Sequence, residues 1–188
     1  MAMLAYVFWH RPHASVDPVG YEGAMMRFQA QLTRHPPPGL IGAWSHRIDA
    51  VPWLGDQPGY EDWCLLQGSW AMDPLNGFAV AGDVLAPHDA LAAQMAFGAG
   101  GLYARDLGEA CAAIESRALW LIRPRGIQYR PVLNAACAGI PSVTAWRRQM
   151  VLGPAPEFCV EVPVGANFQT PQGWQAREVK RARVMPPV

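Results

Sequence analysis

The strongest constraint on this chain is an internal echo, because two stretches about a hundred residues apart carry the same pattern. The first copy is Ala43–Arg47 followed by Tyr60–Leu66, and the shorter second copy is Ala145–Gln149 followed by Pro156–Val162. An aromatic stretch that ends in Arg-Pro precedes each copy. Solenoid repeats have periods of about 20–50 residues, so this longer repeat predicts a duplicated small domain.

Charge and hydropathy exclude several classes of partner. The 15 basic and 15 acidic side chains cancel, so we expect no nucleic-acid partner, because such a partner needs a basic surface. No apolar run approaches the roughly 20 residues that span a bilayer, so no membrane association is expected. His10, Arg11 and Pro12 interrupt the amino-terminal apolar stretch, and no basic segment precedes it. The sequence therefore predicts no signal peptide and a cytoplasmic protein.

The four cysteines are expected to be buried free thiols. They show no C-x-x-C spacing and lie among apolar neighbours, where a free cysteine packs as a small hydrophobic side chain. They are Cys64, Cys111, Cys137 and Cys159. Cys64 and Cys159 fall at matching places in the two copies, which predicts a shared core position rather than a disulfide.

The first copy predicts the order strand, helix, strand, strand. These elements are expected at residues 3–10, 21–32, 40–48 and 62–70. Asp73 as N-cap, with a proline after it, predicts a helix over 74–80. A further helix is expected to begin at Pro87-His88-Asp89, with His88 or Asp89 as its cap, and to end at the glycines of 98–101. A short strand would follow at 101–107.

The second copy predicts the same order with one helix missing. The expected elements are strands at 119–123, 142–150, 158–162 and 174–184 and a helix at 129–138. The last strand carries basic residues that we expect to face solvent. The two units would span 1–112 and 113–188 and share one core.

Two such units resemble the dimeric α+β barrel superfamily. The resemblance implies an α+β fold, in which two ferredoxin-like βαββ(α)β units pack their antiparallel sheets face to face as a barrel within one chain. Members of the superfamily include small monooxygenases, lactone isomerases, haem-binding and haem-degrading proteins and stress-response proteins. Their functional residues lie at differing positions, so none transfers to a numbered residue here.

The residues that differ between the copies are the candidate catalytic pair. His46 shares a strand face with Trp44, and Arg148 stands beside Trp146 where His46 stands in the first copy. If these faces line the barrel cavity, an imidazole would lie opposite a guanidinium, which suits an anionic or carbonyl-bearing ligand. The alternative is that both side chains lie on a solvated face or at a strand end.

Other polar residues complete the predicted site. His10, Arg47 and Arg147 lie in or at the end of strands, where they could contact a ligand together with Trp44 and Trp146. The histidines lack metal-ligand spacing, so the sequence predicts no metal and no cofactor. The glycines at 98–101 follow a helix and precede a strand, the reverse of a phosphate-binding loop. Glu61 is expected to be structural and to pair with Arg47 or Arg147.

Two functions remain open at this point. The eight tryptophans could line a cavity for a small hydrophobic or aromatic ligand, and the protein would then be a cofactor-independent monooxygenase or isomerase. Alternatively, the tryptophans fill the barrel, and the protein is a non-catalytic structural or binding protein. A homodimer is compatible with either function, because the missing helix could leave an apolar face uncovered.

Overall fold

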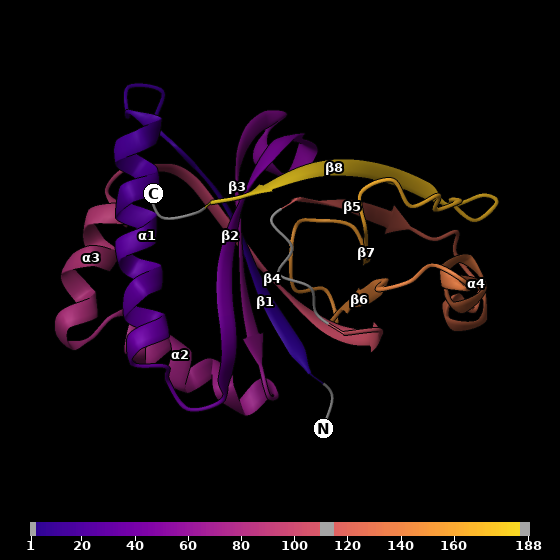
Figure 1. The fold of residues 1–188 in the computed structure, drawn as a ribbon, viewed down its shortest axis with the longest axis horizontal. Coiled ribbons are helices and arrows are strands. Elements are labelled where there is room, and N and C mark those ends of the chain that lie inside the picture. The colour runs from indigo at the N-terminus through magenta and orange to yellow at the C-terminus, as the bar shows by residue number, and fades with distance from the viewer. Residues whose placement is uncertain (1–2, 110–114, 185–188) are drawn as a thin grey trace.

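The computed structural model describes residues 3–109 and 115–184, and its strands close into one barrel (Figure 1). Around the barrel the order is β1-β3-β2-β8-β5-β7-β6-β4, and neighbouring strands pair antiparallel. The strands are β1 Leu4–Pro12, β2 Leu40–Val51, β3 Gln57–Leu66, β4 Met95–Leu107, β5 Glu115–Ile122, β6 Thr144–Arg148, β7 Phe158–Val162 and β8 Gln175–Arg183.

Each half of the chain contributes one four-stranded sheet. The first half gives the order β4-β1-β3-β2 and the second gives β8-β5-β7-β6, so the same order recurs. The sheets join where β2 pairs with β8 and where β4 pairs with β6. The predicted α+β barrel within one chain is confirmed. The boundary at residue 112 lies outside the described residues, and the duplication itself stays a prediction.

The helices cover the two sheets unequally. They are α1 Pro18–Arg34, α2 Met72–Ala79, α3 Gly82–Ala92 and α4 Tyr129–Cys137, with short 3-10 turns at Pro52–Leu54 and Ser69–Ala71. In Figure 1, α1, α2 and α3 lie together on the outer side of the first sheet, and α4 lies at the far end of the second. In the part of the chain that the structure describes, no helix lies between β7 and β8, as predicted. None of the described helices is long and apolar enough to cross a bilayer.

Helix α1 begins and ends where its sequence dictates. The side chain of Asp17 accepts a hydrogen bond from the Gly20 amide at 2.8 Å, and Pro18 occupies the first turn. The prolines after His35 cannot continue the helix. The buried side of α1 carries Tyr21, Ala24, Met25, Gln29 and Leu32.

Several predicted boundaries are wrong around α2, α3 and β4. Ala71 rather than Asp73 precedes α2, and α3 begins at Gly82, so His88 and Asp89 lie inside the helix instead of capping it. The glycines of 98–101 belong to β4. Pairing with the full length of β1 holds this segment extended.

Two of these glycines are required by aromatic rings that lie across β4. A Cβ atom at Gly98 would meet the Phe8 ring at 2.7 Å, and one at Gly100 would meet the Tyr6 hydroxyl at 2.7 Å. Strand β4 can therefore pass beneath Tyr6 and Phe8 only where it lacks side chains. The glycines reflect close packing rather than the end of a helix.

Aromatic side chains fill the barrel interior. Trp9, Trp63, Trp120 and Trp146 are fully buried, and Trp9 packs edge-on against Trp120 with ring centroids 5.4 Å apart. Each buried aromatic ring of this size contributes about 1.5–3 kcal/mol through removal from water. The interior is consequently a packed core.

The described cysteines are free and buried, but they do not share a position. Cys64 packs between the first sheet and its helices, whereas Cys159 packs inside the barrel. The strand register explains the difference, because Trp146 pairs with Cys159 as Trp44 pairs with Trp63. Cys159 therefore corresponds to Trp63 rather than to Cys64, and this shift of one residue places the two cysteines on opposite faces of their sheets. Cys111 lies outside the described residues.

Candidate functional site

A buried ion cluster lies at the centre of the barrel. The Arg181 guanidinium contacts Glu61 and donates to Glu161 Oε1 at 2.7 Å, and all three side chains are almost completely buried. Burial raises the pKa of Glu161, although the positive charge of Arg181 opposes that rise. Burial alone would lower the pKa of Arg181, but the carboxylates outweigh it and the pKa is raised. Arg181 therefore stays charged.

Indole groups complete the hydrogen bonding of the two carboxylates. Glu61 accepts bonds from Trp9 and Trp63 at 2.8 and 2.7 Å, and Glu161 accepts one from Trp146 at 2.7 Å. A buried carboxylate keeps its charge only with such donors around it. Glu61, Glu161, Arg181 and the three tryptophans therefore have a structural role in the barrel core.

The predicted catalytic pair does not meet at one recess. His46 is fully buried in β2, in register with Glu61 on β3 and Arg183 on β8. Arg148 lies on the other sheet and donates to the carbonyl groups of Gly153 and Ala155 at 3.1 and 2.6 Å. The recess lined by Arg148 is not lined by His46. As a joint catalytic pair, His46 and Arg148 remain untested.

Arg47 and Arg147 lie on the outer faces of their strands. Arg47 donates to Glu22 on α1 at 2.6 and 2.8 Å, which lowers the pKa of Glu22. Arg147 donates to Asp106 at 3.2 Å and lies over the Tyr129 ring of α4. Arg47 thus joins the first sheet to α1, and Arg147 joins β6 to β4 and α4. They do not pair with Glu61, so that expectation is wrong.

Of the predicted ligand residues, Trp44 and Trp146 belong to the core. Their strand faces point inward as expected, and Trp44 stacks on Trp63 with ring centroids 6.4 Å apart. Trp146 contacts Trp63 at 5.3 Å. Neighbouring rings therefore occupy the space in which a ligand was expected.

His10 takes part in a polar chain outside the barrel, beneath the helices. It is fully buried on the outer face of β1, with Nδ1 2.6 Å from the Tyr21 hydroxyl and Nε2 3.2 Å from Asp62 Oδ2. Burial, followed by the charge of Asp62, raises the pKa of Tyr21, so this phenol keeps its proton. In the neutral tautomer of His10 that carries its proton on Nε2, Nδ1 accepts from Tyr21 and Nε2 donates to Asp62.

A cavity of about 200 Å³ lies next to this chain, between the first sheet and α1, α2 and α3. Asp62 and Gln29 line it, and each carries a buried oxygen without a protein partner, Asp62 Oδ1 and Gln29 Oε1. The other end of the Gln29 amide donates to Ser45 at 3.0 Å. Most of the remaining lining is apolar: Phe8, Phe28, Leu32, Met72, Leu75, Ala79, Leu91 and Met95.

Two further groups of this cavity remain protonated. Burial and the charge of Asp62 raise the pKa of the Cys64 thiol to about 12. Burial, with smaller effects of Cys64 and Asp62, also raises the pKa of Tyr6. Cys64 is therefore no nucleophile near neutral pH. The Asp62 carboxylate and the His88 imidazole are the other acid–base groups of the lining.

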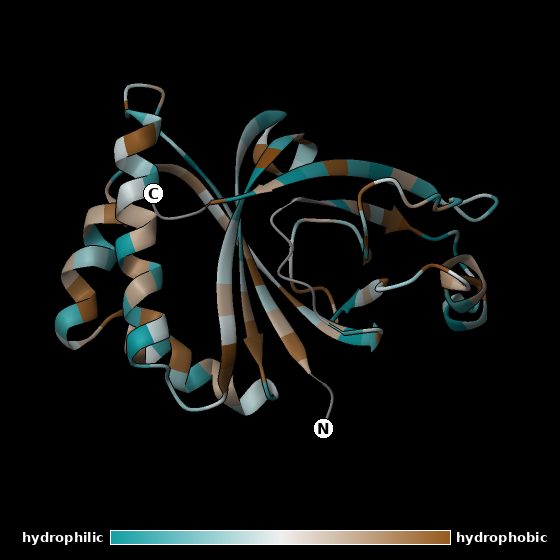
Figure 2. Ribbon diagram, in the orientation of Figure 1, coloured by the Kyte–Doolittle hydropathy of each residue, from teal (hydrophilic) through white to brown (hydrophobic). Residues whose placement is uncertain are grey.

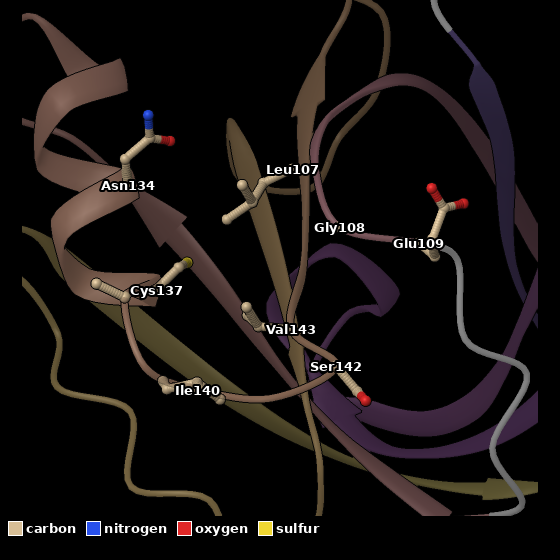
Figure 3. A pocket seen from close by; sticks show the side chains of 9 residues that line it. Leu107, Gly108, Glu109, Asn134, Cys137, Ile140, Ser142 and Val143 are labelled. Atoms are coloured by element: carbon tan, nitrogen blue, oxygen red, sulfur yellow. The ribbon is translucent and has the colours of Figure 1, made fainter.

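A different recess lies at the end of α4 (Figure 3). Leu107, Cys137 and Val143 face the same gap there, whereas the carboxylate of Glu109 points away from it. Burial raises the pKa of Cys137 to about 11, so this thiol is also protonated. The arrangement offers apolar contact and no acid or base directed into the gap.

No metal centre is built from the described residues. Within 3–109 and 115–184, no three His, Cys, Asp or Glu side chains are grouped closely enough to hold an ion.

The sequence alone did not single out Asp62, Glu161 or Arg181. Asp62 lies in the middle of β3 on the face opposite Trp63, which is the face toward the helices, where His10 lies. Arg181 follows Val179 at the spacing of one strand face, which was the available signal. Figure 2 shows why it was missed, since β8 is mostly hydrophilic along its length.

Solved structures show where this fold recurs. The putative monooxygenase of Fusobacterium nucleatum is 8% identical with a TM-score of 0.61, and 98% of this chain and 93% of that chain are covered. An anthrone oxidase-like protein is 9% identical with a TM-score of 0.52, covering 98% and 92%. A mutant chlorite dismutase from Candidatus Nitrospira defluvii is 4% identical with a TM-score of 0.52, covering 96% and 91%.

The sequence itself matches no protein-family model and no curated protein. The likeness to the solved structures extends over nearly the whole chain, at identities that show the fold alone. This chain has the barrel fold of the dimeric α+β barrel proteins.

Proposed function

We propose that the cavity between the first sheet and α1, α2 and α3 binds a small hydroxylated aromatic compound, and that the protein oxygenates it without a cofactor. The observation that carries the proposal is the pair of unpartnered oxygens on Asp62 and Gln29 in a mostly apolar cavity. A buried acceptor without a donor costs about 1–3 kcal/mol. A ligand with two hydroxyl groups would supply both donors.

The size of the cavity limits the ligand. Its volume is about 200 Å³, which is below the roughly 300–1,000 Å³ of sites for drug-sized molecules. A cavity of about 150 Å³ accommodates benzene. A single ring therefore fits, with its faces against Phe28 and Leu32 and its hydroxyl groups toward Asp62 and Gln29.

Asp62 is the base of this proposal. It accepts the proton of a ring hydroxyl at Oδ1, while His10 donates to Oδ2 and orients the carboxylate. Tyr21 holds His10 in the tautomer that makes this bond. Asp62 would contact the substrate, and the other two are positioning residues.

The oxygenation balances without a cofactor. A deprotonated dihydroxybenzene adds O₂ at a ring carbon, and the resulting hydroperoxide loses water to leave a carbonyl group. The products are a hydroxyquinone and one water molecule, and all four electrons that reduce O₂ come from the ring. One oxygen atom of O₂ remains in the product. The putative monooxygenases and the anthrone oxidase-like protein of the same fold support this choice of chemistry.

Oxygen consumption with hydroquinone tests the proposal. We expect the wild-type protein to consume O₂ and to place one ¹⁸O atom from ¹⁸O₂ in the product, and Asp62→Asn to lose at least about 100-fold in rate. Asp83→Asn, which alters an exposed carboxylate of α3 that does not line the cavity, is the matched control and should keep the rate. Wild-type activity equal to that of the buffer, or full activity of Asp62→Asn, would overturn the proposal.

A non-catalytic protein is the second candidate, favoured by one observation. The barrel interior is filled by tryptophans and by the Glu61–Arg181–Glu161 cluster, as a purely structural barrel requires. The two candidates differ in what happens to a ligand in the cavity between the first sheet and α1, α2 and α3, which we call the helix-covered cavity. Tight binding of hydroquinone there with no consumption of O₂ would support the non-catalytic candidate.

A further inference from the structure

A second recess lies at one end of the barrel, on the opposite side of the strands from the helix-covered cavity. Its volume is about 600 Å³, and we call it the barrel mouth. Trp53, Trp120, Arg148 and Arg177 line it together with three prolines. Trp53 stands on the turn after β2 and packs against Trp120 with ring centroids 5.5 Å apart. The barrel mouth shares no lining residue with the helix-covered cavity.

Three residues of the barrel mouth carry buried N–H groups without a protein acceptor. These groups are the indole N–H of Trp53, the indole N–H of Trp120 and the Nε–H of Arg148. Elsewhere in the interior, Trp9, Trp63 and Trp146 each donate to a carboxylate. Trp44 also lacks an acceptor, but it does not line this recess. Arg11 Nε and Arg181 Nε also lack an acceptor outside the recess, but the barrel mouth brings three such donors together in one lining.

The charges around the barrel mouth also favour an anionic hydrogen-bond acceptor. Arg148 and Arg177 contribute positive charge, and the single lining carboxylate, Glu157, already pairs with Arg123 at 3.1 Å. Arg148 is fixed by the carbonyl groups of Gly153 and Ala155, and Arg177 donates to the Ala50 carbonyl at 2.7 Å. Guanidinium groups that are held in place lose little entropy when they bind an anion.

We propose that the barrel mouth binds a small aromatic carboxylate. The carboxylate oxygens would accept from the Arg148 and tryptophan N–H groups, and the ring would pack against the indole faces and prolines. The helix-covered cavity offers unpartnered acceptors and therefore favours a donor, whereas the barrel mouth offers unpartnered donors and favours an acceptor. The two sites thus select ligands of opposite hydrogen-bonding character.

Titration with benzoate, followed by tryptophan fluorescence and calorimetry, tests this proposal. We expect saturable binding at one site that weakens as salt is added, because the charges at the recess are partly screened. Benzyl alcohol has the same ring without the charge, and it should bind at least about ten-fold more weakly. Saturable benzoate binding that is insensitive to salt and matched by benzyl alcohol would overturn the proposal, as would no binding.

Substitutions assign the binding to the recess. Trp53→Phe keeps an aromatic ring at this position and removes the N–H donor, so the affinity for benzoate should fall about ten-fold. Trp70→Phe, at a tryptophan that is 47% exposed and outside the recess, is the matched control and should leave the affinity unchanged. Because Arg148 also holds the loop at Gly153, Trp53→Phe is the decisive variant. Equal affinity of Trp53→Phe and the wild type would overturn the proposal.

The test of benzoate binding is independent of the oxygenase proposal. Asp62→Asn should leave benzoate binding unchanged, whereas it should abolish hydroquinone oxygenation. Loss of benzoate binding in Asp62→Asn would place the carboxylate in the helix-covered cavity and would contradict a site at the barrel mouth.

Discussion

Removal of Arg181 is the most informative perturbation of the barrel core. Arg181 is buried between Glu61 and Glu161, and Arg181→Met would leave both carboxylates in a low-dielectric interior without a cation. Breaking a buried ion pair by removing one partner costs about 3–5 kcal/mol. A protein of this size is stable by roughly 5–15 kcal/mol in total. We therefore expect Arg181→Met to fold with a much reduced free energy of unfolding.

The loss should depend on pH in a defined direction. Burial raises the pKa of Glu161 above its ordinary value of 4.5 even with Arg181 present, and removing the guanidinium raises it further. A carboxyl group whose pKa is raised in the folded state stabilises the fold at low pH, and that contribution is lost as pH rises through the folded-state pKa. The difference between the variant and the wild type should therefore shrink from pH 7 toward pH 5.

Urea unfolding followed by tryptophan fluorescence at pH 5 and pH 7 measures both effects. Arg181→Met combined with Glu61→Gln and Glu161→Gln is the control, because it removes the charges together and should recover most of the loss. A loss below about 1 kcal/mol at pH 7, or a loss that is the same at both pH values, would refute the reasoning.

Three further predictions concern packing and protonation. Gly100→Ala places a Cβ atom 2.7 Å from the Tyr6 hydroxyl and should lower the free energy of unfolding by about 1–3 kcal/mol. Gly77→Ala, whose Cβ atom meets open space in α2, should raise it slightly. Thermal melts measure both variants, and a higher melting temperature for Gly100→Ala than for Gly77→Ala would contradict this packing. Trp146→Phe removes a donor from Glu161 and should cost about 1–3 kcal/mol in urea unfolding, so an unchanged midpoint would contradict the role given to the indole. The Cys64 thiol, whose pKa is raised to about 12, should resist a thiol-specific disulfide reagent at pH 8 until urea unfolds the protein, and rapid labelling of Cys64 in the native protein would contradict its burial.

Strand alternation made most of the fold predictable. In β7, Phe158, Val160 and Val162 face outward to the second sheet's own apolar layer, and Cys159 and Glu161 face inward, as the period of two requires. Glu161 itself was not predicted to be a core residue, because an acid on a strand ordinarily indicates a solvated face. Its burial is favourable because Arg181 on β8 supplies a positive charge and the Trp146 indole on β6 supplies a hydrogen-bond donor.

The candidate site was predictable only in part. His10 was identified from its place in the first strand, but its partners Tyr21 and Asp62 come from a helix and from β3, 11 and 52 residues away. Sequence spacing cannot show that such groups meet, because their contact depends on how α1 lies across the sheet. The matching places of His46 and Arg148 in the two copies predict a site inside the barrel, but the closed sheets bring tryptophans into contact with one another there.

The location of a bound phenol tests the central claim most directly. Crystals of the protein soaked with 4-bromophenol would give an anomalous signal from bromine that marks the ligand without ambiguity. The account predicts a single strong site in the cavity between the first sheet and α1, α2 and α3, with the phenol oxygen beside Asp62 Oδ1. Bromine among the tryptophans inside the barrel, or no ordered bromine next to Asp62, would contradict it.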